Sequence, residues 1–181
     1  MRSIINAVII ILLSFILISC THYRYYTTGT RDYYSLTDED IKKLQFYNSQ
    51  PFQLTREVST LDSKKVAKGH TLRSEQGKLI EEVSFDALIP GVAINSTYDQ
   101  LDISFEEGKT LPFNVLYDNS TYYCLKLEKD NSVLYDGVIY KVDYYYYYSY
   151  NSNPCLFIIA EDLYKVEQKT RHAEGIRLKE N

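Results

Sequence analysis

The chain has 181 residues, of which 24 are acidic and 20 are basic, and its formal net charge at pH 7 is −4. This length suits one domain with flanking segments. The acidic balance argues against nucleic acid as a partner and against polybasic attachment to anionic lipid, because both need a surface rich in lysine and arginine.

Residues 1–19 are predicted to form an export signal. Arg2 supplies a positive charge, and the run from Ile4 to Ile18 is apolar apart from Asn6 and Ser14. A positive charge before an apolar core is the layout of a secretory signal. The alternative is an uncleaved membrane helix, for which this uncharged stretch lies at the short end of the length that a bilayer requires.

The signal ends at residues 17–20 with the sequence LISC. This sequence resembles the lipobox of bacterial lipoproteins, in which a cysteine receives a diacylglyceryl group. The resemblance implies cleavage before Cys20, acylation of its new amino group with a fatty acid such as palmitate, and an address in the cell envelope. Several acyl chains anchor stably where one chain would be marginal. Thr21 stands where aspartate would favour inner-membrane retention, so the resemblance points to the outer membrane.

Residues 20–36 show neither helical nor strand periodicity and are predicted to be a tether between the anchor and the folded domain. We expect a mainly-β domain with an N-terminal helix at 37–162 and a polar C-terminal tail at 163–181. Within the polar tail region, a short docked helix or strand could be held by Leu163 and Val166.

A helix of about ten residues is predicted to open the domain. Thr37 is the expected N-cap, and Asp40 occupies the position of the acidic partner in a capping box. Ile41 and Leu44 share one face of this helix. The segment 48–51 should end it, since a residue before proline avoids helical dihedral angles.

From Pro51 onward apolar residues alternate with polar ones, which is the pattern of half-buried strands. Strands are expected at 52–58, 79–85, 101–106, 111–117, 123–127, 133–135, 138–142 and 155–160. Asp136-Gly137 is a strong hairpin signal. Turns recur about every 8–12 residues, without the helix–strand alternation of a parallel sheet. The predicted fold class is therefore mainly β, a small antiparallel barrel or sandwich preceded by one short α-helix.

Two cysteines remain after the anchor, Cys124 and Cys155. An exported protein meets an oxidising compartment, so the two could form a disulfide. The interpretation that the sequence favours is two separate thiols. Cys124 alternates with Lys126 and Glu128, which places it on the solvent side of its predicted strand.

Histidines and carboxylates form no catalytic or metal-binding motif in this sequence. His22, His70 and His172 are predicted to lie in surface loops or tails, and their spacing matches no zinc site. Neighbours on a strand point to opposite faces, so the pairs 81–82 and 106–107 are interpreted as solvated glutamates. We therefore predict no metal, no cofactor and no catalytic residue.

A run of tyrosines is the most unusual stretch of the chain, which has 19 tyrosines and no tryptophan. It comprises Tyr144, Tyr145, Tyr146, Tyr147, Tyr148 and Tyr150. One interpretation is an exposed aromatic platform that binds a sugar or a partner protein. The other is a strand end whose rings cover the domain's own flank. The bias of a low-GC genome also raises the tyrosine content.

Segments 41–49 (IKKLQFYNS), 54–58 (LTREV), 101–106 (LDISFE) and 135–140 (YDGVIY) resemble a pattern in uncharacterised lipoproteins of Bacteroidota-type bacteria. The resemblance covers most of residues 38–160 and implies an envelope address without an established activity. The leading hypothesis is a non-catalytic, lipid-anchored module that binds or scaffolds an envelope protein. The alternatives are a carbohydrate-binding module that uses 144–150, and an enzyme with carboxylates converging in a pocket around Glu81 or Glu106.

Overall fold

The computed structural model describes residues 22–59, 69–115, 121–144 and 153–167. Strands dominate these ranges, and the predicted mainly-β fold class is confirmed. The elements in chain order are β1 (Tyr23–Tyr25), α2 (Thr28–Tyr33), α3 (Asp38–Ile41), β2 (Gln45–Asn48), β3 (Phe52–Val58), β4 (Thr71–Glu75), β5 (Lys78–Phe85), β6 (Pro90–Ser96), β7 (Gln100–Glu106), β8 (Lys109–Val115), β9 (Tyr123–Leu125), β10 (Ser132–Tyr135), β11 (Val138–Tyr144), β12 (Leu156–Ile159) and α4 (Ala160–Glu167).

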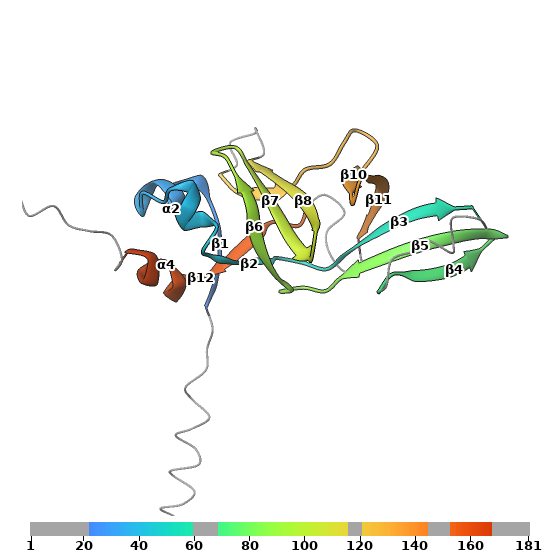
Figure 1. Cartoon of the computed structure of the whole chain (residues 1–181), viewed down its shortest axis with the longest axis horizontal. Coiled ribbons are helices and arrows are strands. Elements are labelled where there is room, and N and C mark those ends of the chain that lie inside the picture. Colours follow the sequence, from blue (N-terminus) through green and yellow to red (C-terminus); the bar gives the residue numbers. More distant parts are fainter. Residues whose placement is uncertain (1–21, 60–68, 116–120, 145–152, 168–181) are drawn as a thin grey trace, which may run out of the picture.

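The strands form two antiparallel sheets (Figure 1). The seven-stranded sheet has the order β1-β12-β2-β6-β7-β8-β9, and the five-stranded sheet has the order β10-β11-β3-β5-β4. Among the described strands, the two outermost strands of each sheet do not pair with each other, so neither sheet closes on itself. The fold therefore follows the sandwich alternative and not the barrel.

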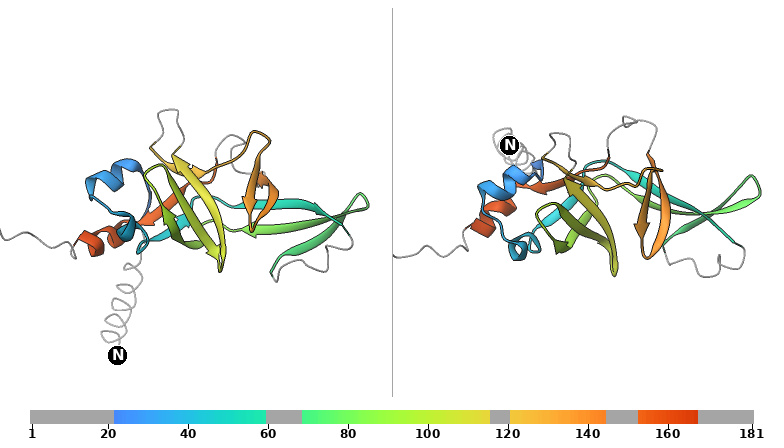
Figure 2. Two further views of the ribbon diagram at one scale, coloured as in Figure 1. Left: turned by 45° about the horizontal axis from the view of Figure 1, so that its top comes forward. Right: turned by 90° about the horizontal axis from the view of Figure 1, so that it is seen from above.

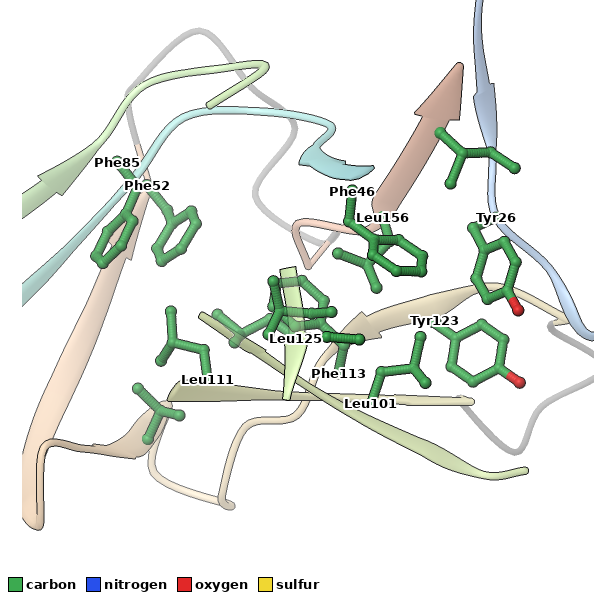
Figure 3. Close-up of a cluster of buried hydrophobic side chains, with 14 of the residues drawn as sticks. Tyr26, Phe46, Phe52, Phe85, Leu101, Leu111, Phe113, Tyr123, Leu125 and Leu156 are labelled. Carbon is green, nitrogen blue, oxygen red and sulfur yellow. The ribbon is translucent and has the colours of Figure 1, made fainter. Parts of the chain in front are cut away.

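Buried side chains from both sheets share one core, shown in Figure 3. Phe52 and Phe85 of the five-stranded sheet stack with ring centroids 4.6 Å apart. Phe113 and Leu125 face them from the seven-stranded sheet and are fully buried. Each such side chain contributes about 1.5–3 kcal/mol through its removal from water. This shared core is what holds the two sheets together.

The five-stranded sheet continues beyond the core as a three-stranded extension. We call this extension the arm: β4, residues 55–58 of β3 and residues 78–82 of β5, which pair in register. All five residues of β4 are exposed. The arm lies at one end of the long axis of the molecule, and α2 and α4 lie at the other end (Figures 1 and 2).

The predicted tether is wrong for the part of it that the structure describes. β1 pairs with β12, and Tyr26 directly after it is fully buried against Phe46 and Tyr123. Thr27 then caps α2 by accepting a hydrogen bond from the Thr30 backbone N–H. A three-residue strand and a six-residue helix are too short to show a period, which is why the sequence pattern missed them.

The predicted N-terminal helix exists but is much shorter than expected. Thr37 and Asp40 form the predicted capping box, and Ile41 and Leu44 are both buried. The helix nevertheless ends at Ile41, because residues 45–48 form β2 between β12 and β6. Sheet pairing on both sides therefore overrides the local helical pattern.

Besides α2, three elements differ from the predictions. The sequence pattern predicted neither α2 nor β6. It also missed β4, because all five residues of this strand are exposed and so show no alternation between a buried and an exposed face. The polar tail begins later than residue 163, since α4 runs to Glu167 and buries Leu163 against the core. Of the two alternatives for this segment, a docked helix or a strand, the structure shows the helix.

Candidate functional site

Most of the residues singled out in the sequence lie outside the described part of the structure. Cys20 does, and so do Tyr145, Tyr146, Tyr147, Tyr148 and Tyr150. Tyr144 is the last residue of β11, where its backbone pairs with Phe52 of β3. The anchor and the tyrosine platform therefore remain predictions.

The two remaining cysteines are joined. Cys124 in β9 forms a disulfide with Cys155, which precedes β12. The bond connects β9 to the segment that leads into the opposite part of the same sheet. Cys124 is buried, so the prediction that it faces solvent is wrong. All three residues of β9 are buried, and alternation along this strand therefore does not separate solvent from core.

A group of interacting ionisable side chains lies where the arm meets the body. We call it the charge cluster, and it comprises Arg56, His70, Glu81, Glu106, Lys109, Tyr135 and Tyr140. These residues come from β3, β5, β7, β8, β10, β11 and the segment that leads into β4. The cluster thus joins elements of both sheets.

Glu81 is the centre of the arm side of the cluster. Its side chain is 1% exposed, and its two oxygens are each bonded: Oε1 lies 2.5 Å from Nδ1 of His70, and Oε2 accepts from Nε of Arg56 at 2.5 Å. Burial alone would raise the pKa of the Glu81 carboxyl, but the hydrogen bonds from His70 and Arg56 outweigh it and hold the pKa below its ordinary value. Glu81 is therefore a buried carboxylate that is ionised and fully paired.

Glu106 is the centre of the body side. Its Oε2 accepts from Nζ of Lys109 at 2.8 Å and from the hydroxyl of Tyr135 at 2.7 Å. Burial would raise the pKa of Glu106, and these two hydrogen bonds lower it further than burial raises it. Burial and the neighbouring carboxylate both raise the pKa of Tyr135, so the phenol stays protonated and donates.

His70 connects the two sides. Its Nε2 lies 3.0 Å from Nζ of Lys109 and 3.8 Å from Oε2 of Glu106. A lysine ammonium can only donate, so Nε2 accepts and the ring proton sits on Nδ1, where it is donated to Glu81. The His70 side chain is 2% exposed, so the prediction of a surface-loop histidine is wrong.

The sequence carries a signal for this cluster. Arg56 and Glu81 each occupy an apolar phase of their strands, beside residues such as Leu54 and Val83 that are buried. In the structure the two are direct cross-strand partners. A charge in the buried phase of each of two strands predicts such a pair, and the interpretation of Glu81 as solvated was therefore wrong.

The cluster is arranged as a linkage and not as an open reaction site. The enzyme hypothesis expected a pocket with carboxylates converging around Glu81 or Glu106, and both do approach the imidazole of His70. The ring and the Glu81 carboxylate are covered, however, and their polar atoms are bonded to one another. Neither the His70 ring nor the Glu81 carboxylate is therefore open to a substrate in this structure.

A groove opens at the other end of the molecule, between β1, α2 and α4. Its volume is about 410 Å³, and it is lined by Arg24, Tyr25, Gly29, Thr30, Tyr33, Tyr34, Ile158 and Leu163. Among the described residues that line it, Arg24 alone carries a full charge, and three of the others are tyrosines. The groove therefore combines aromatic walls with one guanidinium.

The described ranges lack two kinds of feature, a metal-ligand cluster and a membrane-spanning helix. No group of three or more histidine, cysteine, aspartate or glutamate side chains is placed there to hold a metal ion. The helices found in those ranges all lack the length and apolar character needed to span a bilayer.

Comparisons with protein-family models, with curated proteins and with solved structures find no match to this chain. The chain's own residues and geometry are therefore the basis of its proposed function.

Proposed function

We propose that this chain is a lipid-anchored cell-envelope protein, in the outer membrane, whose β domain is a non-catalytic module that binds or scaffolds a protein partner. The observation that carries the proposal is the LISC sequence at 17–20 together with the position of the first strand. β1 begins at Tyr23, so only Thr21 and His22 separate it from Cys20. A lipid on Cys20 would hold a folded domain directly at the membrane.

The chemistry of the charge cluster supports a binding role over catalysis. Its carboxylates, imidazole and lysine are bonded to one another at 2.5–3.0 Å. Such pairing stabilises charges that are already formed and leaves no free base or nucleophile aimed at solvent from His70 or Glu81. The cluster instead holds the arm in a fixed orientation relative to the body.

An apolar pair on the β10–β11 hairpin supports the binding of a protein. Leu134 and Ile139 are direct cross-strand partners and are 59% and 67% exposed. Partners in this register lie on the same face, so the two side chains form one patch. Exposed contiguous apolar side chains mark interaction surfaces more often than scattered ones do.

Metabolic labelling with radioactive palmitate tests the anchor. We expect label in the native protein and its loss in Cys20→Ala. Ser19→Ala is the matched control, because it keeps a small residue before the cysteine and should label normally. Absence of label from the native protein would overturn the proposal.

Affinity capture from envelope extract tests the binding role. The double variant Leu134→Ser with Ile139→Ser should lose any partner that the native acylated protein captures. Tyr33→Ser is the control, since Tyr33 is also exposed but lies at the other end of the molecule in α2. Equal capture by the double variant would exclude the hairpin patch as the binding surface.

A further inference from the structure

The outer face of the seven-stranded sheet is aromatic at the edge where the described chain begins. Tyr25 of β1 is opposite Phe157 of β12, which is opposite Tyr47 of β2. Cross-strand partners lie on one face of a sheet. Their neighbours along the strands, Phe46 and Ile158, are buried in the core, so this row points outward.

Ring contacts extend the row into a continuous surface. Tyr23 meets Tyr47 edge-on with ring centroids 5.0 Å apart, Tyr25 meets Phe157 at 4.5 Å, and Tyr25 meets Tyr122 at 5.0 Å. We call these five residues the aromatic face. Tyr25 is 47% exposed and Tyr122 is 42% exposed, while the other three are partly exposed. Packed rings of this kind form a stiff surface.

The position of the anchor limits what can cover this face. Cys20 is three residues before Tyr23 in the sequence. Three residues reach at most about 10–11 Å, because an extended chain advances about 3.3–3.6 Å per residue. A lipidated Cys20 at the bilayer surface therefore brings β1, which is the edge strand of its sheet, to the level of the lipid head groups.

The side chains of the aromatic face suit the head-group region of a bilayer. A tyrosine ring has an apolar body and a hydroxyl that can stay in water, and tyrosine is enriched at membrane–water interfaces for this reason. The one charged residue of β1, Arg24, pairs with Ile158 and so points to the opposite side of the sheet. At the α4 side, Asp162 and Lys165 are paired with each other at 2.6 Å, and Glu161 and Glu167 are the remaining charged residues of this helix.

We propose that the aromatic face lies on the lipid bilayer, so that the domain is oriented by its own surface and not only tethered by its acyl chains. This inference rests on the lipid anchor proposed above. It has a consequence for the rest of the molecule, because the arm lies at the end of the long axis away from α2 and α4 (Figure 2). An oriented domain presents the arm and the hairpin patch in a fixed direction.

Photo-cross-linking of the full-length acylated protein tests the inference. The protein is purified with its lipid, its Cys20 acylation is checked by intact mass, and it is reconstituted into vesicles of phosphatidylethanolamine and phosphatidylglycerol. A benzoylphenylalanine residue replaces Tyr25 or Tyr122, and Ile139 at the hairpin patch is the control position. We expect phospholipid adducts at 25 and 122 with a yield severalfold above that at 139.

The outcomes separate this inference from the proposed function. A protein without acyl chains on Cys20 overturns both. An acylated protein that gives no excess of lipid adduct at 25 and 122 overturns only the aromatic-face inference. Cross-links from these positions to a second copy, or to another protein, overturn it as well, because the face is then a protein interface. Tyr122 lies outside the strands, so the adduct yield at position 122 can be measured even if the replacement of Tyr25 disturbs β1.

Discussion

Nδ1 of His70 lies 2.5 Å from Oε1 of Glu81, and neither side chain is more than 2% exposed. The contact joins β5 to the segment that leads into β4. Lys109 of the β7–β8 hairpin adds a second contact, to Nε2 of the same His70 ring. Glu81 also forms an ion pair with Arg56. Such a pair contributes little beyond its desolvation cost, but removal of one partner leaves the other uncompensated. The orientation of the arm therefore depends on the complete cluster.

Replacement of Glu81 should destabilise the fold strongly. In Glu81→Gln the guanidinium of Arg56 and the ring of His70 lose their shared acceptor charge, and we expect the free energy of unfolding to fall by about 2–4 kcal/mol. Urea unfolding measures this change. Glu57→Gln is the control, because Glu57 is an exposed partner of Lys78 in the same arm and should cost under about 1 kcal/mol. Equal effects of the two substitutions would contradict the role of the cluster.

The free energy of unfolding should fall as the pH is lowered, and the titration of Glu81 and Glu106 should cause this fall. Both carboxyls have a pKa in the folded state below the ordinary glutamate value of about 4.3. A lowered folded-state pKa gives stability that is complete above the unfolded pKa and is lost as the pH falls through the folded pKa. We expect the free energy of unfolding to decline below about pH 5. In Glu81→Gln this decline should be shallower, and an unchanged slope would count against the assignment.

The Cys124–Cys155 bond should contribute substantially to stability. It closes a loop with a sequence separation of 31, for which the chain-entropy model gives about 3–4 kcal/mol. The double variant Cys124→Ser with Cys155→Ser should lose about this much in urea unfolding. Thiol titration of the unfolded, unreduced native protein should find neither cysteine free. Titration of two thiols would show that the bond is not formed in the protein.

Gly91 should be intolerant of a side chain. A Cβ at this position of β6 would lie 2.7 Å from Cγ2 of Ile103 and 2.7 Å from the ring of Phe105. Gly91→Ala should cost about 1–3 kcal/mol through overpacking. Gly29→Ala is the matched control: its Cβ would meet nothing closer than Thr27 Oγ1 at 3.7 Å, and alanine favours the helix that contains it. Both are measured by thermal unfolding, and a neutral Gly91→Ala would contradict the packing of β6 on β7.

Local signals were sufficient for the elements whose partners are close in sequence. Asp136 and Gly137 both have positive φ and close the β10–β11 hairpin at the predicted residues. The capping box at Thr37 is likewise confirmed. These features depend on a few consecutive residues, and their physical cause can be read directly from the sequence.

Features that depend on distant partners could not be predicted in the same way. β1 is a strand because β12, near the other end of the described chain, pairs with it. His70 is buried because Glu81 and Lys109 converge on its ring from two different sheets. The sequence signal for this cluster is the presence of Arg56 and Glu81 at positions where the alternation of their strands places apolar residues.

Mass spectrometry of the amino terminus of the protein purified from its own membrane tests the central claim most directly. The account predicts an N-terminal peptide that begins at Cys20 and carries a diacylglyceryl group on its sulfur and a fatty acid on its amino group. A chain that still begins at Met1, or a Cys20 whose thiol is unmodified, would contradict the lipid anchor and every orientation derived from it.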